Sequence, residues 1–366
     1  MNTAIEGVSI AQAAAAIAAG GKHKAVIVTG AMGEGKTQGI AAILKKQFPK
    51  HVFIQLDTPS LDLGDLMIPK FMDMNDKDYV RFVPNEMLGL HLDQPVIINL
   101  DEIGKANASI KNALRPILVQ RMLNGVALHP DSIVYGTTNL DGEGLGDMLM
   151  PHQRNSVAVL KLRKSTNLEW IQWGAVNDID PLVLGWVKEE PALFQSFEEV
   201  NVPSDNPYIY HPREHREQFV TGRSLASASY WVSKRDELDS DTLTGLLVGT
   251  IGAPAAFNLM TFIKMASSFP SLESIKQDPF TAVVPSKING QCYVMFRALA
   301  AIEADWVDAW MDYSARLNPE VQAVFASALI NRSDKDVHPK QKLFTRNKKF
   351  SDWTIDNVYI FQADKR

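Results

Sequence analysis

Near the N-terminus, a short stretch of residues has the types and spacing of a phosphate-binding loop. The stretch matches G-x-x-x-x-G-K-[ST] and consists of Gly30, Ala31, Met32, Gly33, Glu34, Gly35, Lys36 and Thr37. In such a loop, backbone N–H groups and the start of the following helix together bind an anion. Lys36 is expected to reach the outer phosphates of a nucleotide, and the Thr37 hydroxyl to ligate Mg²⁺.

Two neighbouring carboxylates follow an apolar run further along the chain. The run Pro95–Leu100 reads PVIINL, and Asp101 and Glu102 come directly after it. Asp101 is expected to hold Mg²⁺ through water, which this ion tolerates well. Glu102 is expected to polarise the attacking water as a general base. The alternative is that the two carboxylates only cap the next helix.

An asparagine ends a further apolar run. Ser132–Thr137 reads SIVYGT, and Thr138 and Asn139 follow. An amide at this place can orient a water near the γ-phosphate, so Asn139 is a candidate catalytic residue. Taken alone, an asparagine after a strand is more often a turn residue.

The elements that must position these residues alternate between strand and helix. The predicted strands are short apolar, β-branched runs: Ala25–Thr29, His51–Leu56, Pro95–Leu100, Ser132–Thr137 and Val157–Leu162. Helices are predicted over Lys36–Lys46 and Asn107–Leu123. This alternation predicts an α/β domain with a five-stranded parallel sheet flanked by helices. Because ligands of such sheets collect at the carboxyl ends of the strands, the three candidate segments should meet there.

The pattern changes after about residue 164. Helical segments without alternating strands are predicted at Leu168–Trp173, Pro181–Lys188, Thr221–Lys234, Thr242–Ala266 and Asn289–Leu317. We therefore predict a nucleotide-binding domain over 1–164, an all-α domain over 165–330 and a basic C-terminal extension over 331–366.

Composition excludes several classes of protein. The 366 residues are 46% hydrophobic and 22% charged, which is typical of folded globular proteins and not of disordered ones. The net charge of −5 argues against a protein that binds nucleic acid over its whole surface. A single cysteine, Cys292, excludes a disulfide framework and a multi-cysteine metal site, and a buried structural thiol is expected there.

No membrane segment or signal peptide is expected. The uncharged stretch Thr242–Ile263 is interrupted at Gly252 and Pro254, which favours two short buried helices joined by a turn. The alanine-rich stretch Ile10–Ala19 has no basic residue before it, unlike a signal peptide. A cytoplasmic location is expected.

The order of these motifs resembles that of AAA+ ATPases, and within them the MoxR-like branch. The resemblance is carried by Gly30–Thr37, Leu100–Ala106, Thr137–Asn139 and Phe219–Leu225. It implies a P-loop AAA+ domain followed by a helical lid. It also implies a ring, usually a hexamer, that hydrolyses Mg-ATP between subunits and remodels a partner protein in a chaperone-like way. Members commonly act with a von Willebrand A-domain partner.

The resemblance also assigns two arginines. Arg223 looks like the sensor that reaches from the lid to the γ-phosphate of its own subunit, although Gly222 replaces the usual proline before it. The arginine finger of the family would fall near Ser156, and Arg154 lies two residues earlier. Either Arg154 takes this role or the subunit activates its neighbour poorly.

The segment between Leu61 and Leu90 resembles the hairpin-like insert of MoxR-like proteins, which faces the ring pore. Phe71, Met72 and Met74 could grip a polypeptide there, since methionine and aromatic side chains adapt to varied surfaces. The alternative is that they form the core of a small hairpin.

Two further features are weighed against this interpretation. His211–His215 has the H-x-x-E-H spacing of a zinc-protease motif, but it contains a proline and lies in a predicted loop, so metalloprotease chemistry is not expected. The basic run Lys340–Lys349 could contact nucleic acid, or could be a solvated charged tail. Two other functions therefore stay open: a DNA-directed motor or loader, and an ATP-gated scaffold with little turnover.

Overall fold

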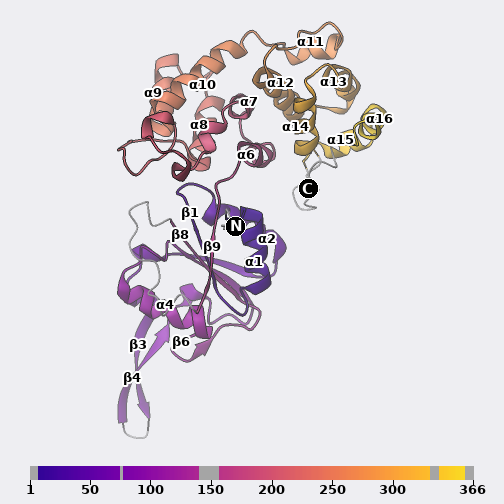
Figure 1. Cartoon of the computed structure of the whole chain (residues 1–366). Helices are drawn as coiled ribbons and strands as arrows, with labels where there is room; N and C mark the ends of the chain where they lie inside the picture. The colour runs from indigo at the N-terminus through magenta and orange to yellow at the C-terminus, as the bar shows by residue number, and fades with distance from the viewer. Residues whose placement is uncertain (1–6, 75–76, 140–155, 330–337, 359–366) are drawn as a thin grey trace, which may run out of the picture. The chain divides into compact units, whose positions relative to one another are not determined.

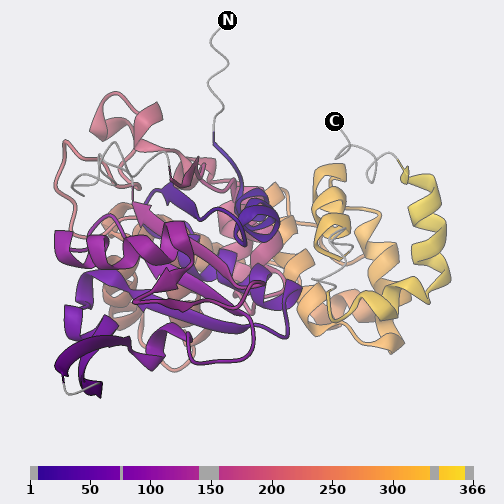
Figure 2. The same cartoon turned by 90° about the horizontal axis from the view of Figure 1, so that it is seen from below.

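The computed structural model describes residues 7–74, 77–139, 156–329 and 338–358. The chain divides into two compact units, Met1–Lys164 and Ser165–Arg366. Figures 1 and 2 show a sheet with its helices in the first unit and helices in the second. Each unit has a hydrophobic core of its own.

A five-stranded parallel sheet forms the centre of the first unit. Its strands are β1 (Val26–Gly30), β2 (Val52–Asp57), β5 (Val96–Asp101), β8 (Ile133–Asn139) and β9 (Ala158–Lys161). They lie in the order β2-β5-β8-β1-β9, and every neighbouring pair is parallel. All five predicted strands are confirmed, with ends that differ by one or two residues.

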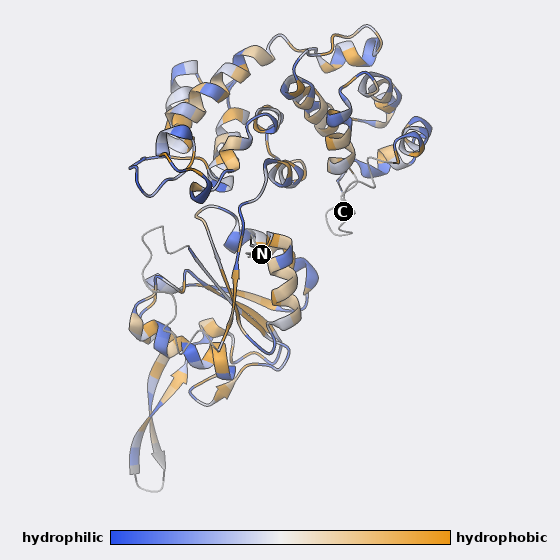
Figure 3. Cartoon of the chain, viewed as in Figure 1, coloured by the Kyte–Doolittle hydropathy of each residue, from blue (hydrophilic) through white to orange (hydrophobic). Residues whose placement is uncertain are grey.

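Helices cover both faces of this sheet because its strands are apolar on both sides. On one face, Val26 and Val28 pack with α1 (Ile10–Gly20) and α2 (Lys36–Gln47). On the other face, Ile27 packs with α4 (Ala108–Gln120). Figure 3 shows the central strands as mainly hydrophobic. The predicted architecture is confirmed: a five-stranded parallel sheet with flanking helices, followed by a region of helices.

The helix predicted over Asn107–Leu123 is too long at its C-terminal end. Arg121 adopts a left-handed conformation with φ 60° and caps α4. Asn124 and Gly125 follow with φ 48° and 80°, and the turn joins β6 (Met122–Leu123) to β7 (Val126–Ala127). Asn-Gly is a strong hairpin signal, and it overrides the helical periodicity here.

The chain segment that connects β2 to β5 includes an antiparallel hairpin, which extends away from the sheet (Figure 1). It consists of β3 (Met67–Met74) and β4 (Lys77–Pro84) and follows the short helix α3 (Leu63–Leu66). The hairpin predicted between Leu61 and Leu90 is thus present.

The described residues of the second unit form helices joined by loops, with no strand among them. Its α-helices are α6 (Asn167–Gly174), α7 (Pro181–Lys188), α8 (Gly222–Ser233), α9 (Ser240–Ile251), α10 (Ala253–Ala266), α11 (Leu272–Gln277), α12 (Ile288–Ala301), α13 (Val307–Ser314), α14 (Pro319–Leu329), α15 (Gln341–Thr345) and α16 (Lys348–Asp356). The predicted break at Gly252 is confirmed, with φ 83° at the junction of α9 and α10. The stretch Asn289–Leu317 is two helices instead of one, because the chain leaves helical geometry at Ile302.

The C-terminal helices are part of the second core. Phe344 of α15 and Phe350 of α16 are buried, and their rings lie 5.3 Å and 6.4 Å from that of Phe325. Phe344 within the basic run Lys340–Lys349 and Phe350 directly after it therefore pack inward. Among the described residues, none of the helices is both long and apolar enough to cross a membrane.

Candidate functional site

The phosphate loop connects β1 to α2, and its glycines make this turn possible. Gly33 and Gly35 have φ 71° and 78°, a region that side chains disfavour. Gly35 is the N-cap of α2 and provides no side-chain cap, so the helix starts with N–H groups that a bound anion can accept from.

Lys36 is buried under this loop. Its Nζ donates to the carbonyl oxygens of Gly30 and Ala31 at 2.7 and 2.6 Å and to Oδ1 of Asn139 at 2.7 Å. Asn139 reaches this position because it pairs with Gly30 in the register of β8 and β1. The ammonium group is therefore held beside the loop by acceptors from two strands.

The Asp101 carboxylate lies against the start of α2. Its Oδ1 accepts from the Thr37 hydroxyl at 2.8 Å and also from the hydroxyl of Thr137. Its Oδ2 accepts from Nε2 of Gln55 at 3.3 Å. A carboxylate and a hydroxyl this close are hard oxygen donors of the kind that Mg²⁺ prefers, so the residues present fit this ion.

Glu102 occupies a strained turn directly after β5. Its φ is 53°, which is uncommon for a residue with a side chain. The turn is fixed to β8 by the Ile103 N–H, which donates to the Thr137 carbonyl at 3.0 Å. The Glu102 carboxylate forms an ion pair with Lys105. To act as a general base, the Glu102 carboxylate must leave Lys105 and accept a hydrogen bond from the attacking water.

Sequence reasoning missed a buried pair of polar side chains, one of which lies two residues before Asp101 on β5. Asn99 of β5 lies opposite Tyr135 of β8, and both are fully buried. Neither amide atom of Asn99 nor the hydroxyl of Tyr135 has a hydrogen-bond partner among the described residues. Burial raises the pKa of Tyr135, and the negative charge of Asp101 adds to this effect. The signal in the sequence was an asparagine inside an otherwise apolar run.

The remaining site predictions fall elsewhere. Glu34 of the loop is buried and lies 3.7 Å from Nζ of Lys164. Arg154 lies outside the described residues. Arg223 belongs to the second unit, where it is exposed in the first turn of α8. The roles of both arginines stay predictions.

Two of the three candidate ligands in the H-x-x-E-H sequence, His211 and Glu214, have partners within the chain. Nε2 of His211 lies 3.1 Å from the Val200 carbonyl, and its Nδ1 accepts from the Arg213 N–H at 3.2 Å. Glu214 is paired with Arg216. Across the part of the chain that is described, no group of three or more His, Cys, Asp or Glu residues could hold a metal ion.

Cys292 is buried in α12, and burial raises the pKa of its thiol to about 12. A thiol with this pKa is protonated near neutral pH and is a poor nucleophile. The structure thus agrees with the predicted structural role.

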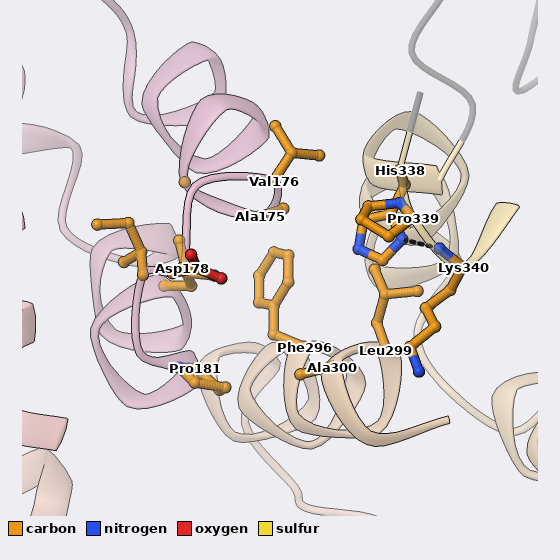
Figure 4. A pocket seen from close by; sticks show the side chains of 13 residues that line it. Ala175, Val176, Asp178, Pro181, Phe296, Leu299, Ala300, His338, Pro339 and Lys340 are labelled. Atoms are coloured by element: carbon orange, nitrogen blue, oxygen red, sulfur yellow. Dashed lines mark hydrogen bonds between the residues drawn. The ribbon is translucent and has the colours of Figure 1, made fainter. Parts of the chain in front are cut away.

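A small pocket lies in the second unit, with a volume of about 180 Å³ (Figure 4). Phe296 and Leu299 form its apolar wall, and Asp178 and His338 lie on opposite sides. Nδ1 of His338 accepts from the Lys340 N–H at 3.1 Å, and burial lowers the pKa of this histidine. This hydrogen bond is local to the C-terminal segment, and the buried ring of His338 forms part of the pocket wall.

Comparisons with known proteins identify similar folds at low identity. The chain is similar to NtrX from Brucella abortus in complex with ADP, at 13% identity and a TM-score of 0.37, covering 98% of this chain and 69% of that one. It is also similar to a RuvB mutant of Thermotoga maritima, at 15% identity and a TM-score of 0.40, covering 92% and 86%. A third similar structure is Hsp104 with ATPγS and casein, at 15% identity and a TM-score of 0.36, covering 70% and 46%. No protein-family model and no curated protein sequence matches the chain.

Proposed function

We propose that this protein is an ATPase of AAA+ type that uses Mg-ATP hydrolysis to remodel a partner protein. The observation that carries the proposal is the convergence at one sheet edge. Lys36 meets Asn139 at 2.7 Å, and Thr37 meets Asp101 at 2.8 Å. These contacts join the phosphate loop to the ends of β5 and β8.

Each residue has a proposed task. The loop residues Gly30 to Thr37 bind the phosphates of the nucleotide. Lys36 exchanges its present hydrogen-bond acceptors for the outer phosphates. Thr37 and Asp101 would hold Mg²⁺. The ion, when bound, neutralises charge that develops on the phosphates. Glu102 takes a proton from the attacking water, and Asn139 orients that water.

The proposed active assembly is a ring, with a hexamer as its expected size. Arg223 is the proposed sensor within one subunit, and Arg154 the proposed finger toward the next. The exposed hairpin β3–β4 supports contact with a protein, because it presents Phe71 at 81% exposure away from the sheet. A von Willebrand A-domain protein is one candidate partner.

A DNA-directed motor is less well supported by the packing. Phe344 and Phe350 of the basic run are buried, so neither can stack on a base. Lys349 of this run is paired with Asp312 at 2.6 Å.

The deciding experiment measures ATPase rate per subunit against protein concentration. We expect a rate that rises with concentration in the wild type and vanishes in Glu102→Gln, with nucleotide binding retained. Glu86→Gln, an exposed carboxylate of the same unit, is the matched control and should keep the wild-type rate. Bound ATP with negligible turnover at every concentration and with partner present would instead indicate a scaffold.

A further inference from the structure

The backbone of the hairpin β3–β4 has a defined hydrogen-bond register. The Asn85 N–H donates to the Leu66 carbonyl at 3.0 Å, and Leu66 comes directly before β3 and Asn85 directly after β4. In an antiparallel pair, hydrogen-bonded and non-hydrogen-bonded residue pairs alternate. Leu66 and Asn85 therefore form a hydrogen-bonded pair, and so do Ile68 and Val83. Pro69 and Phe82, the next pair, are then a non-hydrogen-bonded pair. Every second residue from them therefore directs its backbone groups outward, away from the partner strand.

The two outer edges of the hairpin differ. Pro69 interrupts the edge of β3, because proline has no N–H to offer. Along β4, the outward positions Asp78, Val80 and Phe82 each carry an N–H and a carbonyl, and the proline of this edge, Pro84, comes only at its end. Among the residues that the structure describes, β4 pairs with β3 and with no other strand. The edge of β4 is therefore the one that can accept another strand.

The outward positions share one face of the hairpin, where Phe71, Val80 and Phe82 form an apolar cluster and Asp78 adds a carboxylate. Phe71 is 81% exposed, and Val80 opposite it is 45% exposed. Phe82, next along β4 on the same face, is 49% exposed. An incoming strand beside β4 would place every second side chain against this face.

The opposite face of the hairpin carries a pair of cations beside the exposed Ile68 and Tyr79. Lys70 lies directly across from Arg81, and both are exposed. Like charges directly opposite each other destabilise a strand pair. Neither has an ion-pair partner among the described residues. A carboxylate beside Arg81 would neutralise this pair.

We propose that the free edge of β4 binds an extended segment of a partner protein as an added strand, in which apolar residues alternate with Asp or Glu. The apolar residues would contact Val80 and Phe82, and the acidic ones Arg81. A nucleic acid has no peptide backbone to pair with this edge. The inference rests on the proposed function only in taking a protein as the partner.

The test uses the full-length protein without nucleotide, so its result does not depend on hydrolysis. The probe is a fluorescein-labelled peptide of alternating valine and glutamate, followed by fluorescence anisotropy. Two versions carry N-methyl groups on alternate residues, one set at valine and the other at glutamate. Strand addition requires the backbone groups of one set only. We therefore expect one methylated peptide to bind about tenfold more weakly and the other to bind normally.

Protein variants test the same edge from the other side. Val80→Pro removes the outward N–H but keeps an apolar side chain of similar size, whereas Val80→Ala keeps the N–H and removes two methyl groups. If the N–H matters more than the methyl groups, Val80→Pro should bind about tenfold more weakly than Val80→Ala. Arg81→Glu should weaken binding of the glutamate peptide and favour a valine–lysine peptide. Circular dichroism should show that each variant folds.

Several results would overturn the proposal. Equal binding of both methylated peptides, or equal loss in Val80→Pro and Val80→Ala, would mean that no strand is added. Equal binding of glutamate and lysine peptides would exclude the acidic pattern. Loss of self-association in Val80→Pro, without peptide binding to the wild type, would identify a second copy of the chain as the occupant. If the wild-type protein binds the peptide but has no ATPase activity, the proposed function is rejected and this inference stands.

Discussion

The carboxyl edge of the sheet and the hairpin β3–β4 lie in the same unit but satisfy their polar groups differently. At the sheet edge, Lys36 and Asp101 each have several hydrogen-bond partners within the chain. In the hairpin, Lys70 and Arg81 face each other across the strands, and Phe71 is exposed. The first region is organised before any ligand binds, which suits chemistry that needs fixed geometry. The second offers unpaired groups, which suits binding to a partner.

The largest expected contrast is in stability. Leu100→Ala, next to Asp101 and fully buried, should lower the free energy of unfolding by about 2–5 kcal/mol because it leaves a cavity. Phe71→Ala in the hairpin should change it by less than about 0.5 kcal/mol. Urea denaturation measures both. A Phe71→Ala effect as large as that of Leu100→Ala would show that the hairpin packs against the domain.

Nucleotide binding should depend on the sheet edge and not on the hairpin. Lys36→Ala removes charged hydrogen bonds, each contributing about 1.5–3 kcal/mol, so affinity for ATP should fall roughly 10- to 100-fold. Lys46→Ala, exposed in the last turn of α2, is the control. Fluorescent nucleotide titration checks this, and the hairpin peptide should bind Lys36→Ala normally. Undiminished ATP affinity in Lys36→Ala would remove the basis for the proposed function.

Neighbouring threonines on β8 sharpen the comparison within the sheet edge itself. The Thr137 hydroxyl donates to Asp101, whereas the buried Thr138 hydroxyl has no hydrogen-bond partner in the described part of the chain. Thr137→Val should lower the free energy of unfolding by about 1.5 kcal/mol and raise the Mg²⁺ concentration needed for ATP binding. Thr138→Val should be neutral or slightly stabilising. Thermal unfolding with and without Mg-ATP distinguishes the two, and equal effects would contradict the assigned contacts.

The smallest expected effect is at Asn99. Its amide is buried without a partner among the described residues, so Asn99→Leu should raise the free energy of unfolding by about 1 kcal/mol. Asn139→Leu, which removes an acceptor of Lys36, should lower it. Chemical denaturation of both variants provides the measurement. Destabilisation by Asn99→Leu would indicate that a bound water or ion satisfies the amide.

The sequence alone predicted the elements of the sheet and the residues at its edge. Gly30 to Thr37, Asp101 and Asn139 were found because they follow apolar runs, and parallel strands bring such ends together. Patterns of this kind are local, so they can be read without coordinates. The pair Gly252 and Pro254 marked a helix break for the same reason.

Only the tertiary structure decided features that depend on register or on contacts between distant segments. The bond from Lys36 to Asn139 needs β1 beside β8, and the unpaired row of Asn99 and Tyr135 needs β5 beside β8. The burial of Phe344 within the basic run also depends on the tertiary structure, because residues distant in sequence supply its neighbours. The free edge of β4 likewise follows from pairing, since the residue sequence does not show which backbone groups point outward.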